Sequence, residues 1–359
     1  MRDLGRFDYV IVGAGSAGCV LANRLSADPS VNVLLLEAGG KDDWIWTKIP
    51  VGYLYCMGNP RTDWCFSTEA DPGLNGRSLA YPRGRVLGGC SAINGMIYMR
   101  GQARDYDLWR QMGNVGWGWD DVLPYFRRSE DHYAGADDAH GAGGEWRVEE
   151  QRLHWDILDR VRDACAEVGI PKVADFNRGD NFGSSYFQVN QRKGVRWSTA
   201  TGFLKPAMNR PNLSVVTGAL AERIEIADGR ATGLRLRVNG EPARAAVDGE
   251  LVLAAGAIGS PHILQLSGLG PADVVKGLGG EVVRDCPEVG GNLQDHLQLR
   301  LVYRVKDAVT LNTLSGSLLG RARIALEYAL RRSGPMAMAP SQLGVFAKSD
   351  PSFETANLE

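Results

Sequence analysis

Near the N-terminus the chain contains the glycine spacing of a nucleotide-binding turn, Gly13-Ala14-Gly15-Ser16-Ala17-Gly18. In this G-x-G-x-x-G pattern the first glycine permits a tight turn, the second lets the backbone approach a pyrophosphate, and the third allows a helix to pack closely on a strand. Glu37 follows Gly18 by 19 residues, where a carboxylate can accept hydrogen bonds from ribose hydroxyls. The pattern predicts a dinucleotide site that comprises Gly13, Gly15, Ser16, Gly18, Glu37 and Ala38.

The elements around these residues have the order that the motif requires. Residues 9–12 are an apolar run that predicts a buried strand, residues 16–25 predict a helix, and residues 31–36 predict a second apolar strand. Such a βαβ opening distinguishes a binding motif from an ordinary glycine turn. It does not by itself separate FAD from NAD, because both cofactors use the same fingerprint.

Three further segments resemble the signatures of the glucose-methanol-choline (GMC) oxidoreductase family. Residues 84–101, GRVLGGCSAINGMIYMRG, resemble the first signature, residues 256–270, GAIGSPHILQLSGLG, resemble the second, and residues 291–296, GNLQDH, resemble another family block. With the βαβ opening, the resemblance runs from Tyr9 to about Val302 and is strongest to bacterial choline dehydrogenase-like members. It implies a flavoprotein whose cofactor is FAD.

The resemblance also implies which residues contact the cofactor. In the family the first signature lies along the flavin, which assigns flavin contacts to Val86, Asn94, Gly95, Met96 and Ile97. The pair Gly88 and Gly89 suits a backbone that passes against a planar ring or a phosphate, because a Cβ atom there would collide with it. Ala221 would meet the adenine through its main chain. Arg83, Arg85 and Arg100 are either partners of the pyrophosphate or ordinary salt-bridged surface arginines.

The histidines of the similar segments are not expected to be catalytic. His262 follows a proline at an expected helix start and is interpreted as a packing or capping residue, and His296 belongs to the third block. The family's catalytic histidine and its His or Asn partner belong to a later C-terminal segment, so they are expected beyond residue 359. Some members attach FAD covalently through a histidine of the first signature, but Ile93 stands at that position here, which implies non-covalent FAD.

We therefore expect an α/β fold, with a Rossmann-like FAD-binding domain of the GMC type and a partial sheet-based substrate domain. Residues 1–149 and 195–302 are expected to form the discontinuous FAD-binding domain, residues 150–194 and 303–359 the incomplete substrate domain, and the C-terminal catalytic segment to be absent. Turn pairs at 228–229, 239–240 and 248–249 predict an antiparallel meander that leads into a buried strand at 251–256. Helices are predicted at 120–129, 157–168 and 318–332, and a strand at 343–346.

Composition excludes several classes of partner. The 40 Lys and Arg residues nearly balance the 42 Asp and Glu residues, giving a net charge of -2, so no global field attracts nucleic acid. The six cysteines are scattered without metal-ligand spacing, and no bound metal is expected. No stretch is predicted to span a bilayer. We expect a cytoplasmic protein, and peripheral association with the inner membrane is left open.

By family resemblance, the function is an FAD-dependent alcohol or choline dehydrogenase or oxidase. A small alcohol, choline or another primary alcohol, would lose its hydroxyl proton to a histidine and pass a hydride to flavin N5, and oxygen or a quinone would accept the electrons. The alternatives are a truncated FAD-binding module without turnover, a hydroxynitrile-lyase-like member, and a nicotinamide-dependent dehydrogenase, which has no need of the 84–101 segment. The motifs name neither the alcohol, nor the choice between oxidase and dehydrogenase, nor the oligomeric state, nor whether this fragment is active.

Overall fold

The computed structural model describes residues 1–359, which divide into two compact units. The first contains Met1–Trp44, Tyr55–Ile93 and Ser198–Val302, and the second contains Ile45–Leu54, Asn94–Trp197 and Tyr303–Glu359. This division groups residues 94–149 with the second unit, whereas the sequence assigned them to the FAD-binding domain; both divisions separate the chain after residue 302. The contribution of residues 94–149 to a cofactor domain stays a prediction.

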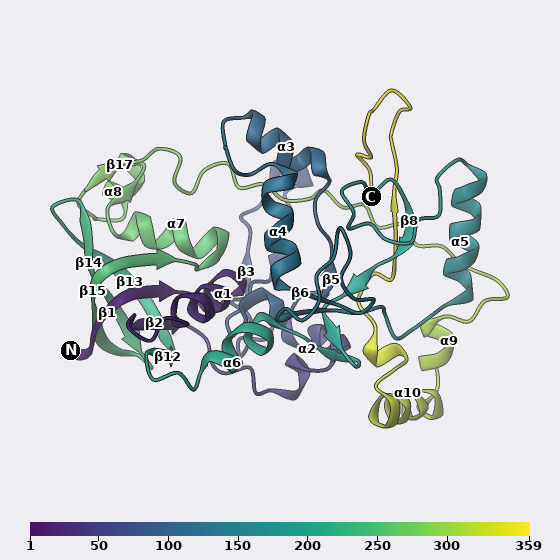
Figure 1. The fold of residues 1–359 in the computed structure, drawn as a ribbon, viewed down its shortest axis with the longest axis horizontal. Coiled ribbons are helices and arrows are strands. Elements are labelled where there is room, and N and C mark those ends of the chain that lie inside the picture. Colours follow the sequence, from purple (N-terminus) through teal and green to yellow (C-terminus); the bar gives the residue numbers. More distant parts are fainter. The chain divides into compact units, whose positions relative to one another are not determined.

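A six-stranded sheet forms the centre of the first unit (Figure 1), in the order β12-β2-β1-β15-β14-β13. The pairings of β12 with β2, of β2 with β1 and of β1 with β15 are parallel, and β13, β14 and β15 form an antiparallel meander. The α/β Rossmann-like fold class is thereby confirmed. The strands are β1 (Arg2–Val12), β2 (Val33–Glu37), β12 (Leu213–Thr217), β13 (Ala219–Ala227), β14 (Arg230–Val238) and β15 (Glu241–Leu253).

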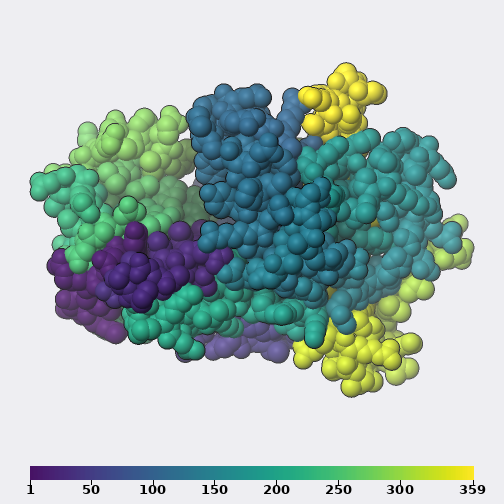
Figure 2. Space-filling model, in the orientation of Figure 1, coloured from purple at the N-terminus to yellow at the C-terminus, as the bar shows by residue number.

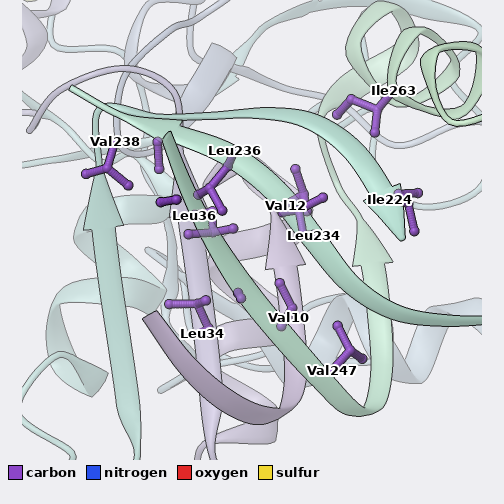
Figure 3. Close-up of a cluster of buried hydrophobic side chains, with 13 residues drawn as sticks. Val10, Val12, Leu34, Leu36, Ile224, Leu234, Leu236, Val238, Val247 and Ile263 are labelled. Carbon is purple, nitrogen blue, oxygen red and sulfur yellow. The ribbon is translucent and has the colours of Figure 1, made fainter. Parts of the chain in front are cut away.

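Both faces of the central strands are buried, which explains their unbroken apolar sequences. Successive residues of a strand point to opposite faces, so Val10 and Val12 share one face with Leu34 and Leu36. Figure 3 shows these side chains in one cluster with Leu234 and Leu236 of β14 and with Ile263 of α7 (Gly256–Leu266). Ile11 points to the other face, where Gly18 of α1 (Ser16–Leu25) packs against it.

Two of the three predicted hairpin turns are confirmed, and the third is wrong. Asp228-Gly229 and Asn239-Gly240 connect β13, β14 and β15 with positive φ at all four residues, as tight hairpins of the right twist require. The pair at 248–249 lies inside β15 instead. A Cβ atom at Gly249 would come within 2.4 Å of the Asp8 carbonyl oxygen, and β1 and β15 shift register beside it. Gly249 therefore allows the irregular pairing of β15 with β1 at this point and does not form a hairpin turn.

The predicted helices at 120–129, 157–168 and 318–332 and the strand at 343–346 are confirmed within one residue, as α4, α5, α10 and β18. Short two-stranded pairs make up the strand content of the second unit. Its elements are β5 (Ile97–Tyr98), α3 (Ala103–Gln111), α4 (Trp119–Ser129), β6 (Glu130–His132), β7 (Trp146–Val148), α5 (Asp156–Glu167), β8 (Gly183–Tyr186), β9 (Gln188–Val189), β10 (Gln191–Arg192), β11 (Val195–Arg196), α9 (Leu311–Ser315), α10 (Leu318–Arg331) and β18 (Leu343–Phe346).

The first unit also contains shorter elements around its sheet. These are β3 (Phe66–Ser67), β4 (Ala80–Tyr81), α6 (Lys205–Ala207), β16 (Leu269–Gly270), α8 (Ala272–Gly277) and β17 (Arg284–Asp285), while α2 (Tyr53–Cys56) spans a boundary between the units. Residues 291–306 are exposed and form no helix or strand. None of the helices combines the length and the apolar character needed to cross a membrane.

Candidate dinucleotide site

The turn between β1 and α1 is held by backbone contacts that only glycine allows at two positions. Gly13 has φ +102°, and a Cβ atom there would lie 2.5 Å from the Ala254 carbonyl oxygen. A Cβ atom at Gly18 would lie 1.9 Å from the Gly13 carbonyl oxygen. Gly13 N–H also donates to the Leu36 carbonyl at 2.8 Å. The fold itself therefore requires the first and third glycines of the motif.

Gly15 differs from the other two, because the protein leaves space beside it. Its φ of -77° suits any residue, and the nearest atoms to an added Cβ would be 4.0 Å away, an ordinary contact distance. No side chain caps α1 at this end, and Ser16 and Ala17, the first helical residues, are exposed. Unpaired N–H groups beside an open glycine form the arrangement in which a backbone accepts a pyrophosphate.

Glu37 lies at the end of β2, where it joins the glycine turn to the next loop. Its side chain is buried, and its carboxylate accepts the N–H of Ala14 at 2.9 Å and the N–H of Gly39 at 2.8 Å. Burial raises the pKa of Glu37 to about 7, although these two hydrogen bonds and the Arg85 charge oppose the rise. A carboxylate has about four lone-pair positions, so two remain for ribose hydroxyls. Ala38 is half-buried beside it.

The segment around Gly88 and Gly89 lies directly against the glycine turn. Gly88 N–H donates to the Ala14 carbonyl at 2.8 Å, and a Cβ atom at Gly89 would lie 2.7 Å from the Gly15 Cα atom. Gly88 and Gly89 both have positive φ, +92° and +52°. Val86 is fully buried, and its neighbour Leu87 donates to the Gly40 carbonyl. The structure thus brings together two motifs that are about 70 residues apart in the sequence.

A pair of hydroxyl groups that the sequence did not single out fixes this segment. Ser91 Oγ donates to the Gly88 carbonyl at 2.6 Å and lies 2.8 Å from Thr199 Oγ1, while Thr199 N–H donates to Ser91 Oγ. Thr199 precedes a π-helical turn at Ala200–Leu204, which packs against α1; Figure 2 shows the teal residues near 200–217 beside the purple N-terminal segment. No local motif identifies Thr199, so its role is visible only in three dimensions.

Ala221 lies on β13, which forms one edge of the sheet. It pairs with Leu236 of β14 on one side, and no strand is hydrogen-bonded to the other side of β13. The backbone of an edge strand has free donors and acceptors along its open side. This position is compatible with a main-chain contact to a base.

The remaining signature residues belong to the second unit. Asn94 Oδ1 accepts the N–H of Met96 and the Nη1 of Arg196, each at 3.0 Å. Met96 is buried and has φ +63°, an unusual conformation for a residue other than glycine, asparagine or aspartate. A Cβ atom at Gly95 would lie 2.6 Å from Pro340 Cγ, and Ile97 pairs with Val189. Strained backbone of this kind is concentrated at ligand sites.

The three arginines have different surroundings. Arg100 pairs with Glu130 at 3.0 Å and donates to the Ala139 carbonyl. It is therefore salt-bridged, as the alternative predicted, but the predicted surface position is wrong because the side chain is buried. Arg83 is exposed and lies over the Tyr81 ring. Arg85 lies over the Trp64 ring, and its buried Nε has no hydrogen-bond partner. The charge of Arg85 also lowers the pKa of Glu37. Arg85 is therefore the arginine that fits an anion near the glycine turn.

Neither histidine of the similar segments is buried. His262 is exposed in the middle of α7, so the interpretation as a packing or capping residue is wrong: the helix begins six residues earlier, at Gly256, and continues through Pro261. His296 is exposed, and its N–H donates to the Asp295 side chain. The structure contains no cluster of three or more His, Cys, Asp or Glu residues that could hold a metal ion, and Cys19, Cys65, Cys90, Cys165 and Cys286 are free thiols.

The parallel sheet, the glycine turn and Glu37 define a Rossmann-type α/β protein with the features of a dinucleotide site. The model of the GMC oxidoreductase family matches residues 7–298. The chain therefore belongs to the GMC oxidoreductase family, whose members bind FAD.

Known proteins with similar sequences and structures carry the names of oxidoreductases. An oxygen-dependent choline dehydrogenase of Photobacterium profundum is 40% identical over 98% of this chain and 62% of its own length. An alcohol dehydrogenase [acceptor] of Pseudomonas putida is 38% identical over 98% of this chain and 64% of its own length. An FAD-dependent oxidoreductase from Chaetomium thermophilum has a TM-score of 0.85 with 28% identity, over 95% of this chain and 62% of its own. This chain thus spans less than two thirds of the length of each.

Proposed function

We propose that this chain binds FAD non-covalently, and that the protein oxidises a primary alcohol by transferring a hydride to flavin N5. The observation that carries the proposal is the open space at Gly15 beside the uncapped start of α1. Glu37 lies at the end of the adjacent strand β2. Neither the fold nor the backbone conformation requires glycine at this position. A ligand that approaches the backbone closely supplies the missing reason.

Each part of the site has a defined task in this proposal. The N–H groups of Ser16 and Ala17 and the Arg85 guanidinium stabilise the pyrophosphate, and Glu37 accepts hydrogen bonds from the ribose. Ala221 contacts the adenine through its main chain. Val86, Asn94 and the residues from Gly95 to Ile97 contact the flavin. Bound FAD supplies the hydride acceptor, while the protein supplies orientation and electrostatics.

The non-covalent mode rests on Ile93, a buried aliphatic residue at the position of the attaching histidine. An alkyl side chain has no nucleophile with which to form a bond to the flavin. We therefore expect denaturation to release intact FAD.

For the substrate we propose choline or another primary alcohol, with oxygen or a quinone as electron acceptor. The names of the Photobacterium and Pseudomonas relatives support this class of substrate. We assign proton transfer to none of the five histidines of this chain. Because the chain spans 62% of the first relative, an FAD-binding module without turnover is the second candidate.

The first experiment is to purify the chain, record its visible spectrum before and after acid precipitation, and identify the released cofactor by chromatography. We expect a flavin spectrum and free FAD in the supernatant. Flavin that stays in the precipitate would contradict non-covalent binding. A folded chain that takes up no FAD on reconstitution would contradict the assignment of the site. Reduction of the bound flavin by choline or a primary alcohol, followed at the flavin absorbance, separates the enzyme from the second candidate.

Two glycine variants test the site against a merely structural motif. Gly15→Ala should keep the melting temperature of the FAD-free chain but weaken FAD binding by about tenfold or more, because its Cβ enters the space of the pyrophosphate. Gly18→Ala should unfold or strongly destabilise the chain, because its Cβ would overlap the Gly13 carbonyl. Gly277→Ala on α8, where a Cβ meets no atom within 4 Å, is the control. It should change neither the melting temperature nor the affinity for FAD. Unaltered FAD affinity in Gly15→Ala would contradict the proposed role of Gly15.

A further inference from the structure

Helix α10 (Leu318–Arg331) has two apolar faces, only one of which the protein covers. Its inner face carries Tyr328, which is 5% exposed and whose hydroxyl donates to the Gly194 carbonyl at 3.0 Å. Its outer face carries Leu319, Leu326 and Leu330, which are 80%, 59% and 74% exposed. These leucines recur at the i, i+7 and i+11 spacing of one helical stripe. The helix therefore presents a row of unburied leucines to its surroundings.

The stripe is continuous and is extended at the helix start. Exposed Ala322 and Ala329 fill positions beside the leucines, and Leu318, at the first position, is 82% exposed. Single exposed leucines are normal on protein surfaces, but a contiguous row marks an interaction site. A cluster of this kind needs an apolar partner.

The charges around the stripe identify the partner. Residues 318–332 contain four arginines and one glutamate, and all four arginines are exposed. Arg323, four residues after Leu319, lies on the leucine side of the helix and Arg331 borders it, whereas Arg321 donates to the Ser315 carbonyl and Arg332 lies over the ring of Tyr328. The glutamate, Glu327, is half-buried and accepts a hydrogen bond from the Ser333 hydroxyl. This excess of positive charge contrasts with the net charge of -2 of the whole chain. Apolar side chains flanked by arginines complement a surface that is apolar below and anionic above.

Helix α5 (Asp156–Glu167) of the same unit shows that this pattern is not a general property of its helices. It is of similar length, 12 residues, and none of its residues is fully buried. Its sequence, DILDRVRDACAE, contains four acidic residues and two arginines. Its single leucine, Leu158, is half-buried, and Val161 is its one exposed large apolar residue. The outer face of α5 is thus mainly charged and has no row of exposed leucines.

We propose that α10 docks the protein on an anionic lipid surface, with Leu319, Leu326 and Leu330 inserted among the acyl chains and the flanking arginines at the phosphate level. The helix lies parallel to the surface, since its 14 residues are too few to span a bilayer. The docking does not depend on bound FAD. It is therefore testable whether or not the proposed enzymatic activity is found.

The test is sedimentation of the full chain with vesicles of phosphatidylcholine alone or of phosphatidylcholine mixed with phosphatidylglycerol. We expect binding to the mixed vesicles, weaker binding to the neutral vesicles, and loss of binding as salt is raised. The variant Leu319→Ser/Leu326→Ser/Leu330→Ser should bind at least about tenfold more weakly. Arg323→Gln and Arg331→Gln should each weaken binding to the mixed vesicles by about fivefold.

Matched controls lie on α5 and at its C-terminal end, where Val161 and Val168 are 40% and 76% exposed. Val161→Ser/Val168→Ser and Arg160→Gln should leave vesicle binding unchanged, and circular dichroism should show that all variants remain folded. Three results would overturn the proposal: no sedimentation with mixed vesicles, equal binding of the leucine variant and the parent, or equal effects of the α5 controls. A fourth such result would combine two observations. The parent would form a dimer in analytical ultracentrifugation that the leucine variant does not form, and the parent would not bind vesicles.

Discussion

The carboxyl group of Glu37 illustrates a conflict between solvation and hydrogen bonding at a single residue. Burial raises its pKa to about 7, while the N–H groups of Ala14 and Gly39 and the charge of Arg85 favour the ionised form. At neutral pH the group is therefore close to half-ionised in the absence of a ligand. Ribose hydroxyls that donate to the carboxylate would lower the pKa again, because they stabilise the charged form.

This shift predicts how stability depends on pH. The folded-state pKa exceeds the ordinary value near 4.5, so the contribution of Glu37 is fully present below about pH 4.5 and is lost as pH rises through about 7. The FAD-free parent should lose on the order of 3 kcal/mol more stability between pH 4.5 and pH 8 than Glu37→Gln. Urea unfolding at both pH values measures the difference. Parallel pH profiles of the two proteins would contradict it.

At the scale of elements, a buried ionic network joins β6 to the loops around it. His140 lies between Glu130, at 3.0 Å, and Asp175, at 2.7 Å, and Glu130 also pairs with Arg100. The ring of His132 stacks on that of His140 with centroids 3.9 Å apart. Burial lowers the pKa of His140, but the hydrogen bonds and charges of Asp175 and Glu130 outweigh it and raise the pKa to about 9. The imidazolium is thus the form that the network stabilises.

The network predicts a second dependence of the free energy of unfolding on pH. Stability again falls as pH rises, but over a higher pH range than for Glu37. The contribution of His140 is present below about pH 6.5 and is lost as pH rises through about 9. His140→Gln should be less stable than the parent at pH 6, and the gap should narrow by on the order of 2 kcal/mol by pH 10. Unfolding followed by circular dichroism measures the gap, and His154→Gln, at an exposed histidine that pairs with Asp159, is the control. A constant gap would show that His140 acts by packing alone.

At the scale of the whole molecule, the residues proposed to bind the cofactor are divided between two units. The glycine turn, Glu37 and Ala221 belong to the first unit, and the segment from Asn94 to Ile97 belongs to the second. The proposed contacts to the ADP half of FAD are therefore complete within one unit.

This division predicts which fragments of the cofactor stabilise the chain. FAD and ADP should both raise the melting temperature, by an amount that corresponds to about 2.7 kcal/mol at a hundredfold excess over Kd. FMN, which has neither adenosine nor a pyrophosphate, should have a much smaller effect. Dye-based thermal denaturation with each ligand measures this order. Stronger protection by FMN than by ADP would contradict the assignment of the glycine turn to the pyrophosphate.

The sequence alone was sufficient for the βαβ opening, the two hairpins and the helices α4, α5 and α10. These features depend on apolar periodicity and on turn residues within a few positions of one another, so a local pattern specifies them. The turn predicted at 248–249 failed for the same reason. An Asp-Gly pair suits both a hairpin and a bulge, and the choice depends on Asp8, about 240 residues away in the sequence.

Tertiary structure decided everything that depends on distant neighbours. It placed Thr199 beside Ser91, paired Arg100 with Glu130, and brought Gly89 into contact with Gly15. It also decided that α10 buries Tyr328 and leaves Leu319, Leu326 and Leu330 exposed, although all four side chains are largely apolar. Local propensity selects the element, whereas burial and hydrogen-bond partners arise from segments that meet only when the chain folds.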